Sequence, residues 1–212
     1  MFGLFTLGRM LASMTNLTFD QWFPTMVGVS YYQDHDKVAD ACIAQALHIR
    51  ETAEQGGPNW ISDTFNTANG SYNVMHDSLF DDINTWVHNS IVEYCKQLNI
   101  RSNIRNTGSW LNVYTKGDYQ EFHDHAGSHI SAIYCLQADN NSSKIYFKSP
   151  RSSLFQIDAE LNQFNSKSVV YDSEPGKLLI FQSDLEHAVG QLKTDNTRIS
   201  IAYNYEQFSL GF

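Results

Sequence analysis

The sequence predicts an α+β protein in which N-terminal helices support a β-barrel, because the residue pattern changes near residue 105. Before this point apolar residues recur at three- and four-residue steps, which is typical of amphipathic helices. After it come short runs rich in Ile, Val, Tyr and Phe that end at turn residues, as β-strands do. Several short strands at close spacing indicate a barrel or sandwich. We therefore expect one domain over residues 15–212, with 15–105 as mainly helical support and 106–212 as the barrel core.

Two helices are expected in the first part of the chain. One covers Lys37 to Glu54; the other covers Ser78 to Ile100, and Asp77 or Ser78 can cap its start. Between them, residues 56–72 are rich in Gly, Asn and Ser and are expected to form a loop. The second helix has the clearer apolar stripe, which consists of Phe80, Ile83, Val87, Ile91, Tyr94, Cys95 and Leu98.

Strands are expected throughout the second part of the chain. Asp139–Ser143 is a candidate hairpin loop between two of them. Pro175-Gly176 favours a tight turn before a strand, since glycine supplies a positive φ there. The expected strands are Ser109–Thr115, His129–Gln137, Lys144–Lys148, Ser168–Tyr171, Lys177–Phe181 and Arg198–Tyr205.

The composition argues against several classes of protein. With 212 residues, 42% of them hydrophobic, the chain can bury a core and does not resemble a disordered protein. A formal net charge of −9 offers no electrostatic basis for binding nucleic acid. No apolar run reaches the roughly 20 residues of a membrane span. We therefore expect neither a membrane protein nor a nucleic-acid-binding protein.

The cysteines and the first residues bear on where the protein works. Cys42, Cys95 and Cys135 are odd in number and widely separated, which favours reduced thiols and a cytoplasmic location. Residues 1–14 are apolar, but Arg9 lies inside the run and no clear cleavage site follows. We therefore expect residues 1–14 to be a flexible leader rather than a signal peptide.

Three histidines are the candidate metal ligands. His123 and His125 lie two residues apart, so on one strand both would point to the same face. His187 follows a short apolar run and would supply a third imidazole, which leaves coordination positions open for catalysis. Arg198 opens a later apolar run, where its guanidinium could bind a carboxylate with two hydrogen bonds. Ser200 would lie on the same face of the strand as Arg198. The pattern suggests a mononuclear metal that works with a carboxylate co-substrate.

Four segments resemble the prolyl-hydroxylase-like 2-oxoglutarate/iron(II) oxygenases. Tyr114–His125 resembles the segment around the first metal ligand, which has a tyrosine, then a glycine, then His-x-Asp. Ile130–Leu136 resembles the next strand of that family. Gly176–Phe181 followed by His187 resembles the segment with the last ligand. Arg198-Ile-Ser200 resembles the element that holds the far carboxylate of 2-oxoglutarate.

A narrower resemblance points to a phage and bacterial branch of the same superfamily. The closing run Ile199–Asn204 looks like that branch's Arg-Ile-Ser-x-x-Phe-Asn ending, and Trp22–Thr25 looks like its usual beginning. This chain is also similar to that branch in its His123-x-His125 motif, because the branch often has His-x-His in place of His-x-Asp. The detailed resemblance covers roughly residues 107–205, whereas the helical part is only loosely covered.

The resemblance implies a double-stranded β-helix, a jelly-roll barrel like that of the cupins. It implies iron(II), 2-oxoglutarate as co-substrate and dioxygen, with succinate and carbon dioxide as co-products of a hydroxylation. His123, His125 and His187 would bind the metal. Tyr134 would contact the far carboxylate beside Arg198 and Ser200, and Tyr114 would lie near the metal-binding end. The primary substrate is open, a protein side chain or a small molecule, with residues 56–72 and 150–167 as covering loops. The protein would be located in the cytoplasm. If a phage encodes the chain, this would be the cytoplasm of the host.

The chain departs from the common pattern at His125, where most of the superfamily has a carboxylate. Iron could be held by three neutral imidazoles, or Asp124 or another carboxylate could complete the site, although strand parity argues against Asp124 unless a bulge re-aims it. The substitution could also mean that activity is lost and that the chain is a metal-binding accessory protein. A cupin-type dioxygenase with three histidines and no keto acid is the other alternative, and it gives Arg198 no role in co-substrate binding.

Overall fold

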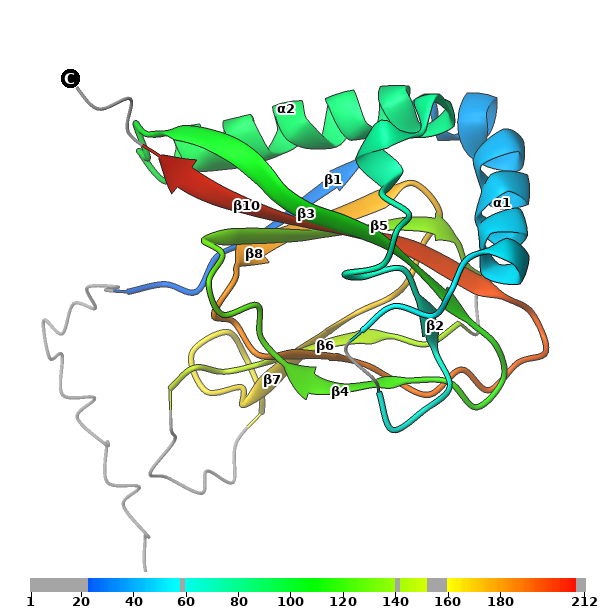
Figure 1. Cartoon of the computed structure of the whole chain (residues 1–212). Coiled ribbons are helices and arrows are strands. Elements are labelled where there is room, and N and C mark those ends of the chain that lie inside the picture. Colours follow the sequence, from blue (N-terminus) through cyan, green and yellow to red (C-terminus); the bar gives the residue numbers. More distant parts are fainter. Residues whose placement is uncertain (1–22, 58–59, 140–141, 152–159, 209–212) are drawn as a thin grey trace, which may run out of the picture.

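The computed structural model describes residues 23–57, 60–139, 142–151 and 160–208, and the predicted leader lies outside them. Within these residues the strands form two facing sheets (Figure 1). The six-stranded sheet has the order β1-β8-β5-β10-β3-β2 and the four-stranded sheet the order β4-β9-β6-β7. The strands are β1 (Val27–Tyr31), β2 (Phe65–Asn66), β3 (Asn103–Tyr114), β4 (Gln120–His123), β5 (Ile130–Gln137), β6 (Ile145–Lys148), β7 (Ser168–Tyr171), β8 (Lys177–Gln182), β9 (His187–Val189) and β10 (Arg198–Phe208).

The chain crosses repeatedly between the two sheets, which is the property that defines a double-stranded β-helix. From β3 onward the strands β3, β5, β8 and β10 belong to the larger sheet, and β4, β6, β7 and β9 belong to the smaller one. The strand pairs in both sheets are antiparallel. The predicted fold class is therefore confirmed.

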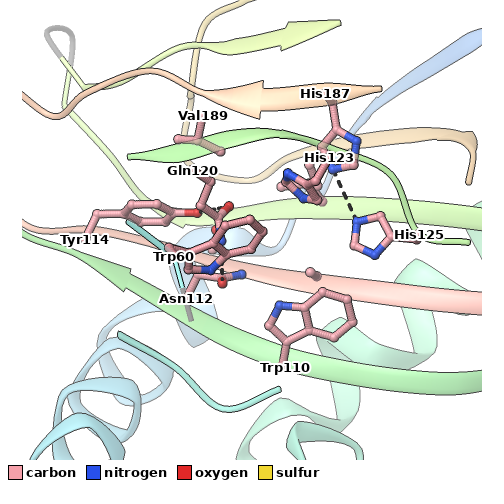
Figure 2. A pocket seen from close by; sticks show the side chains of 12 residues that line it. Trp60, Trp110, Asn112, Tyr114, Gln120, His123, His125, His187 and Val189 are labelled. Carbon is pink, nitrogen blue, oxygen red and sulfur yellow. Dashed lines mark hydrogen bonds between the residues drawn. The ribbon is translucent and has the colours of Figure 1, made fainter. Parts of the chain in front are cut away.

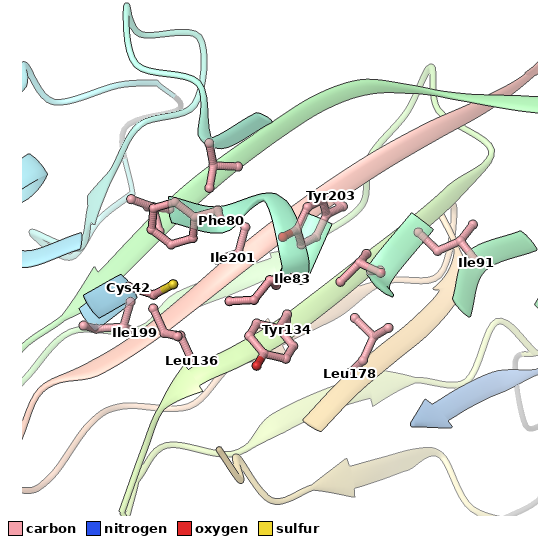
Figure 3. Close-up of a cluster of buried hydrophobic side chains, with 14 of the residues drawn as sticks. Cys42, Phe80, Ile83, Ile91, Tyr134, Leu136, Leu178, Ile199, Ile201 and Tyr203 are labelled. Carbon is pink, nitrogen blue, oxygen red and sulfur yellow. The ribbon is translucent and has the colours of Figure 1, made fainter. Parts of the chain in front are cut away.

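Two helices cover the outer face of the larger sheet (Figure 1). They are α1 (His35–Thr52) and α2 (Asp81–Gln97), and the 3-10 turns η1 (Val74–His76) and η2 (Ser78–Phe80) precede α2. Strand residues that face the helices alternate with residues that face the smaller sheet. Figure 3 shows the resulting core between helices and sheet, and its members include Cys42, Phe80, Ile83, Ile91, Tyr134, Leu136, Leu178, Ile199, Ile201 and Tyr203.

The predicted helices are present with shifted ends. Asp77 accepts a hydrogen bond from the backbone nitrogen of Leu79, so it caps the 3-10 turn η2 that leads into α2. The second helix ends at Gln97 rather than at Ile100. Asn99 has a φ of 56°, a left-handed conformation that cannot continue a helix.

The predicted strands are all present, and β1, β2, β4 and β9 are additional to them. Gly176 has a φ of 80° at the predicted tight turn before β8. The hairpin predicted at Asp139–Ser143 is wrong, because β5 and β6 lie in different sheets and are not paired. A loop that crosses between sheets has the same polar composition as a hairpin loop, so the sequence could not distinguish the two.

Two further properties follow from the described residues. The three cysteines are buried and form no disulfide, as expected for reduced thiols. Neither helix combines the length and the apolar character that a membrane crossing requires.

Candidate metal centre

The three candidate histidines converge on one cavity (Figure 2). β4 runs beside β9, and His123 is the register partner of His187. His125 completes the group, and one ring nitrogen from each histidine lies within 4.8 Å of the others. Among the described residues no carboxylate belongs to this group.

His125 does not lie on the strand that carries His123, which corrects the expectation of two inward-facing residues on one strand. β4 ends at His123, and its register with β9 is irregular. The backbone nitrogen of His125 instead donates to the carbonyl of Ser183 at 2.9 Å. The chain turns directly afterwards, where the backbone nitrogen of Ser128 donates to the carbonyl of His125 at 3.1 Å. The His125 ring stacks on that of His187 with centroids 5.0 Å apart.

Backbone carbonyls orient two of the three rings. Nδ1 of His123 lies 2.7 Å from the carbonyl oxygen of Glu121, and Nδ1 of His187 lies 3.0 Å from that of Leu185. A carbonyl oxygen can only accept, so each Nδ1 carries the hydrogen and each Nε2 keeps its lone pair. Neutral imidazoles oriented in this way fit a divalent transition metal such as iron(II).

Burial keeps these histidines neutral. It lowers the pKa of His123, it lowers the pKa of His125 to about 4, and it lowers the pKa of His187 well below its usual value. The charge that each neighbouring histidine would carry lowers the pKa of His125 and His187 further. The neutral form is the form that binds a metal, so the cluster is ready to coordinate at neutral pH.

Acid should destabilise the chelator-treated protein through these histidines. Unfolding restores their ordinary pKa of about 6.5, so the unfolded state takes up protons first as the pH falls below 6.5. Their contribution to stability is therefore complete above pH 6.5 and is lost as the pH falls towards the folded pKa, about 4 for His125. In His125→Gln the unfolding free energy should fall less steeply with decreasing pH than in the wild type. The difference in slope should be up to about 1.4 kcal/mol per pH unit in this range. Urea titrations at several pH values measure this, and equal slopes for the two proteins would contradict it.

Arg198 is buried without an anionic partner. Its side chain is 0% exposed, and it donates from Nε to Ser173 Oγ at 3.0 Å and from Nη1 to Ser200 Oγ at 3.3 Å. Its Nη2 has no hydrogen-bond partner, and no ion pair in the described part of the chain involves it. The guanidinium lies over the ring of Tyr114, 4.5 Å from its centroid. Because an unpaired buried cation is costly, this arrangement fits a carboxylate ligand.

A cavity joins the histidines to the surroundings of Arg198. Its walls include Tyr114 and Ser200, both of which contact the guanidinium. The hydroxyl of Tyr114 donates to Gln120 Oε1 at 2.6 Å, and Gln120 donates to Asn112 Oδ1 at 3.2 Å (Figure 2). The ring nitrogens of the three histidines therefore lie at a cavity whose walls include two residues that contact the buried cation.

Tyr134 lies elsewhere, which corrects its expected contact with the co-substrate. Its hydroxyl lies 2.7 Å from Nδ1 of His35 in the core under the helices. Strand alternation explains the difference, because the preceding residue, Ile133, lines the cavity. The next residue, Cys135, is the register partner of Ser200.

The other candidate ligands are separated from the centre. His129 is exposed, and its Nδ1 accepts a hydrogen bond from the backbone of Gln207. The carboxylate of Asp124 is also exposed and accepts a hydrogen bond from the backbone of Ala126. Asp124 therefore does not complete the site in this structure.

Two tryptophans that the sequence reasoning missed flank the histidines (Figure 2). The Trp110 ring lies 5.4 Å from that of His125, and the Trp60 ring lies 4.7 Å from that of His123. Trp110 could have been found, since alternation along β3 places it on the same face as Asn112 and Tyr114. Trp60 lies outside the helices and strands, in a segment whose sequence has no periodic signal.

A family model and several solved structures match this chain. Residues 108–204 match the sequence model of a family described as "Putative 2OG-Fe(II) oxygenase". A search of curated proteins finds no significant match. Among solved structures, a prolyl-4-hydroxylase of Pseudomonas putida matches with a TM-score of 0.64 and 11% identity, over 87% of this chain and 94% of that one.

Two other structures have the same fold. A prolyl hydroxylase of Trichoplax adhaerens, solved with a hypoxia inducible factor peptide, has a TM-score of 0.63 and 14% identity, over 85% of this chain and 83% of that one. HygX of Streptomyces hygroscopicus, solved with nickel and 2-oxoglutarate, has a TM-score of 0.58 and 10% identity, over 86% of this chain and 83% of that one. At such identities the likeness establishes the fold alone.

Proposed function

We propose, on the premise that the chain has the family and fold of the 2-oxoglutarate/iron(II) oxygenases, that it is an active dioxygenase of the hydroxylating type. Succinate and carbon dioxide would be its co-products. The observation that carries the proposal is the cavity lined by three neutral histidines and by Tyr114 and Ser200, which contact a buried arginine without an anion.

The residues divide the work between metal and co-substrate. His123, His125 and His187 would hold iron(II), which when bound supplies the redox chemistry that couples oxidation of the keto acid to oxidation of a C–H bond. Arg198 would bind the far carboxylate of 2-oxoglutarate through its free Nη2, with Ser200 beside it and Tyr114 as the wall of the cavity.

Binding of the co-substrate requires side chains to move. The cavity has a volume of only about 20 Å³, which is room for roughly one water molecule and too little for a five-carbon dicarboxylate. Gln120 contributes to its walls and is held by Tyr114 and Asn112. Trp60 contributes from a loop rather than from a strand. Rotation of these two side chains would open the path from the histidines to Arg198.

The alternative function is that of a cupin-type dioxygenase with three histidines and no keto acid. The all-imidazole ligand set favours it, because most of the superfamily has a carboxylate where His125 lies. The unpaired Arg198 favours the keto-acid mechanism, which gives the buried cation a partner. The primary substrate, a protein side chain or a small molecule, and a cytoplasmic location remain predictions.

Turnover of the co-substrate tests the proposal without knowledge of the primary substrate. The protein is loaded with iron(II) and given 2-oxoglutarate labelled at C1 in air, and labelled carbon dioxide is collected. We expect slow release that needs both iron and dioxygen. Iron-dependent oxygen uptake without carbon dioxide would support the alternative function, and absence of both would indicate an accessory protein.

A further inference from the structure

A chain of polar side chains leads from His125 into the larger sheet. Nδ2 of Asn204 lies 3.3 Å from Nδ1 of His125, and Oδ1 of Asn204 accepts from Ser131 Oγ at 2.8 Å. Ser131 Oγ lies 2.8 Å from Ser183 Oγ. Asn204 and Ser131 are register partners on β10 and β5, and the carbonyl of Ser183 also holds the backbone of His125. The side chain and the backbone of His125 are therefore held by the same few residues.

His125 differs from the other two histidines in what faces its Nδ1. A carbonyl oxygen fixes the hydrogen on Nδ1 of His123 and His187. The partner of His125 is a side-chain amide, which can present either a donor or an acceptor after rotation by half a turn. The position of the hydrogen on His125 is thus coupled to the orientation of Asn204.

Two arrangements of hydrogens satisfy this chain of bonds. In the first, the Asn204 amide nitrogen donates to Nδ1 of His125, so Nε2 carries the ring hydrogen and can donate to Nε2 of His187, which lies 3.2 Å away. In the second, the amide is rotated, its oxygen accepts from Nδ1 and its nitrogen donates to Ser131, whose hydroxyl turns towards Ser183. Only the second arrangement frees the lone pair on Nε2 for a metal.

We propose that Asn204 is a positioning residue whose rotated amide oxygen holds the hydrogen of His125 on Nδ1 and so makes this histidine a metal ligand. The inference rests on the proposed function, in which His125 is one of the three ligands. It assigns a neutral amide to support the imidazole that stands where most of the superfamily has a carboxylate. Loading with metal would then reverse the hydrogen-bond chain through Ser131 and Ser183.

Two substitutions at Asn204 separate this role from simple packing. Asn204→Leu keeps the size but removes the acceptor, and we expect about 10–100-fold weaker binding of zinc(II), as for the loss of other outer-shell partners. Asn204→Asp restores an acceptor for Nδ1 and adds negative charge, so binding should be at least as tight as in the wild type. Asn106→Leu is the matched control, since Asn106 donates to the backbone of Asn204 and has no hydrogen bond to a histidine in the described part of the chain.

The experiment combines a competition titration with zinc(II), histidine ¹⁵N NMR and thermal unfolding. In the zinc-loaded wild type, NMR should show the hydrogen of His125 on Nδ1. If Asn204→Leu and Asn204→Asp lose affinity together, or if Asn204→Leu binds as tightly as the wild type, the role of Asn204 is refuted. If the wild type binds no zinc at its histidines, the metal site itself fails. Should Asn204→Leu not fold, the wild-type NMR spectrum and the affinity of Asn204→Asp still decide the question.

Discussion

Replacing Arg198 with methionine is expected to weaken the binding of 2-oxoglutarate by about 10–150-fold, the loss that corresponds to one charge-assisted hydrogen bond of roughly 1.5–3 kcal/mol. The buried guanidinium has a free Nη2 and no ion-pair partner among the described residues, so a bound carboxylate would supply the partner that it lacks. Calorimetric titration of the nickel(II)-loaded protein with 2-oxoglutarate measures the effect without turnover.

Two controls make the result at Arg198 specific. Lys193→Met removes an exposed cation from the loop before β10 and should leave the affinity for 2-oxoglutarate unchanged. The stability of Arg198→Met in the absence of co-substrate should equal or exceed that of the wild type, because the substitution removes an unpaired buried charge. Unchanged affinity in Arg198→Met would remove the co-substrate assignment and favour the mechanism without keto acid.

Replacing His187 with alanine is expected to lower the affinity for iron(II) more than 100-fold. Loss of a residue that only supports a metal ligand costs about 10–100-fold in affinity, and loss of a ligand itself should cost more. Its Nε2 lies within the cluster, and its Nδ1 is fixed by the carbonyl of Leu185. Losing it leaves two imidazoles, which do not complete the three-ligand set of a catalytic site. An anaerobic competition titration with a coloured chelator measures the affinity.

His129→Ala is the matched control for this second experiment. His129 is close to His125 in the chain, but it is exposed and bonded to the backbone of Gln207. Its removal should not change metal affinity. Equal effects of the two substitutions would mean that the metal binds elsewhere or only through exposed histidines.

The sequence predicts much of this site because strand alternation is a strong constraint. Arg198 and Ser200 share a face, and so do Trp110, Asn112 and Tyr114 on the neighbouring strand. Pairing β3 with β10 then places both sets on one side of the sheet, where Ser200 and the three β3 residues line the cavity. The fold class was predictable for a similar reason, since apolar strands at short spacing must close into a barrel or sandwich.

Two errors have identifiable physical causes. The sequence alone places Tyr134 on the wrong side of the sheet, because β5 is buried on both faces and its pattern contains no alternation that distinguishes the cavity from the helices. The sequence pattern places His125 on a strand although this residue follows one, because no residue pattern marks the irregular pairing of β4 with β9. The short strands β2 and β9 have too few residues to show a period.

The most direct test of the central claim is the visible absorption spectrum of the protein loaded with iron(II) without oxygen, before and after addition of 2-oxoglutarate. We predict a weak new band when the keto acid chelates iron held by the three histidines, and we predict its loss in Arg198→Met at the same co-substrate concentration. Iron that binds without producing this band at any concentration of 2-oxoglutarate would contradict the account.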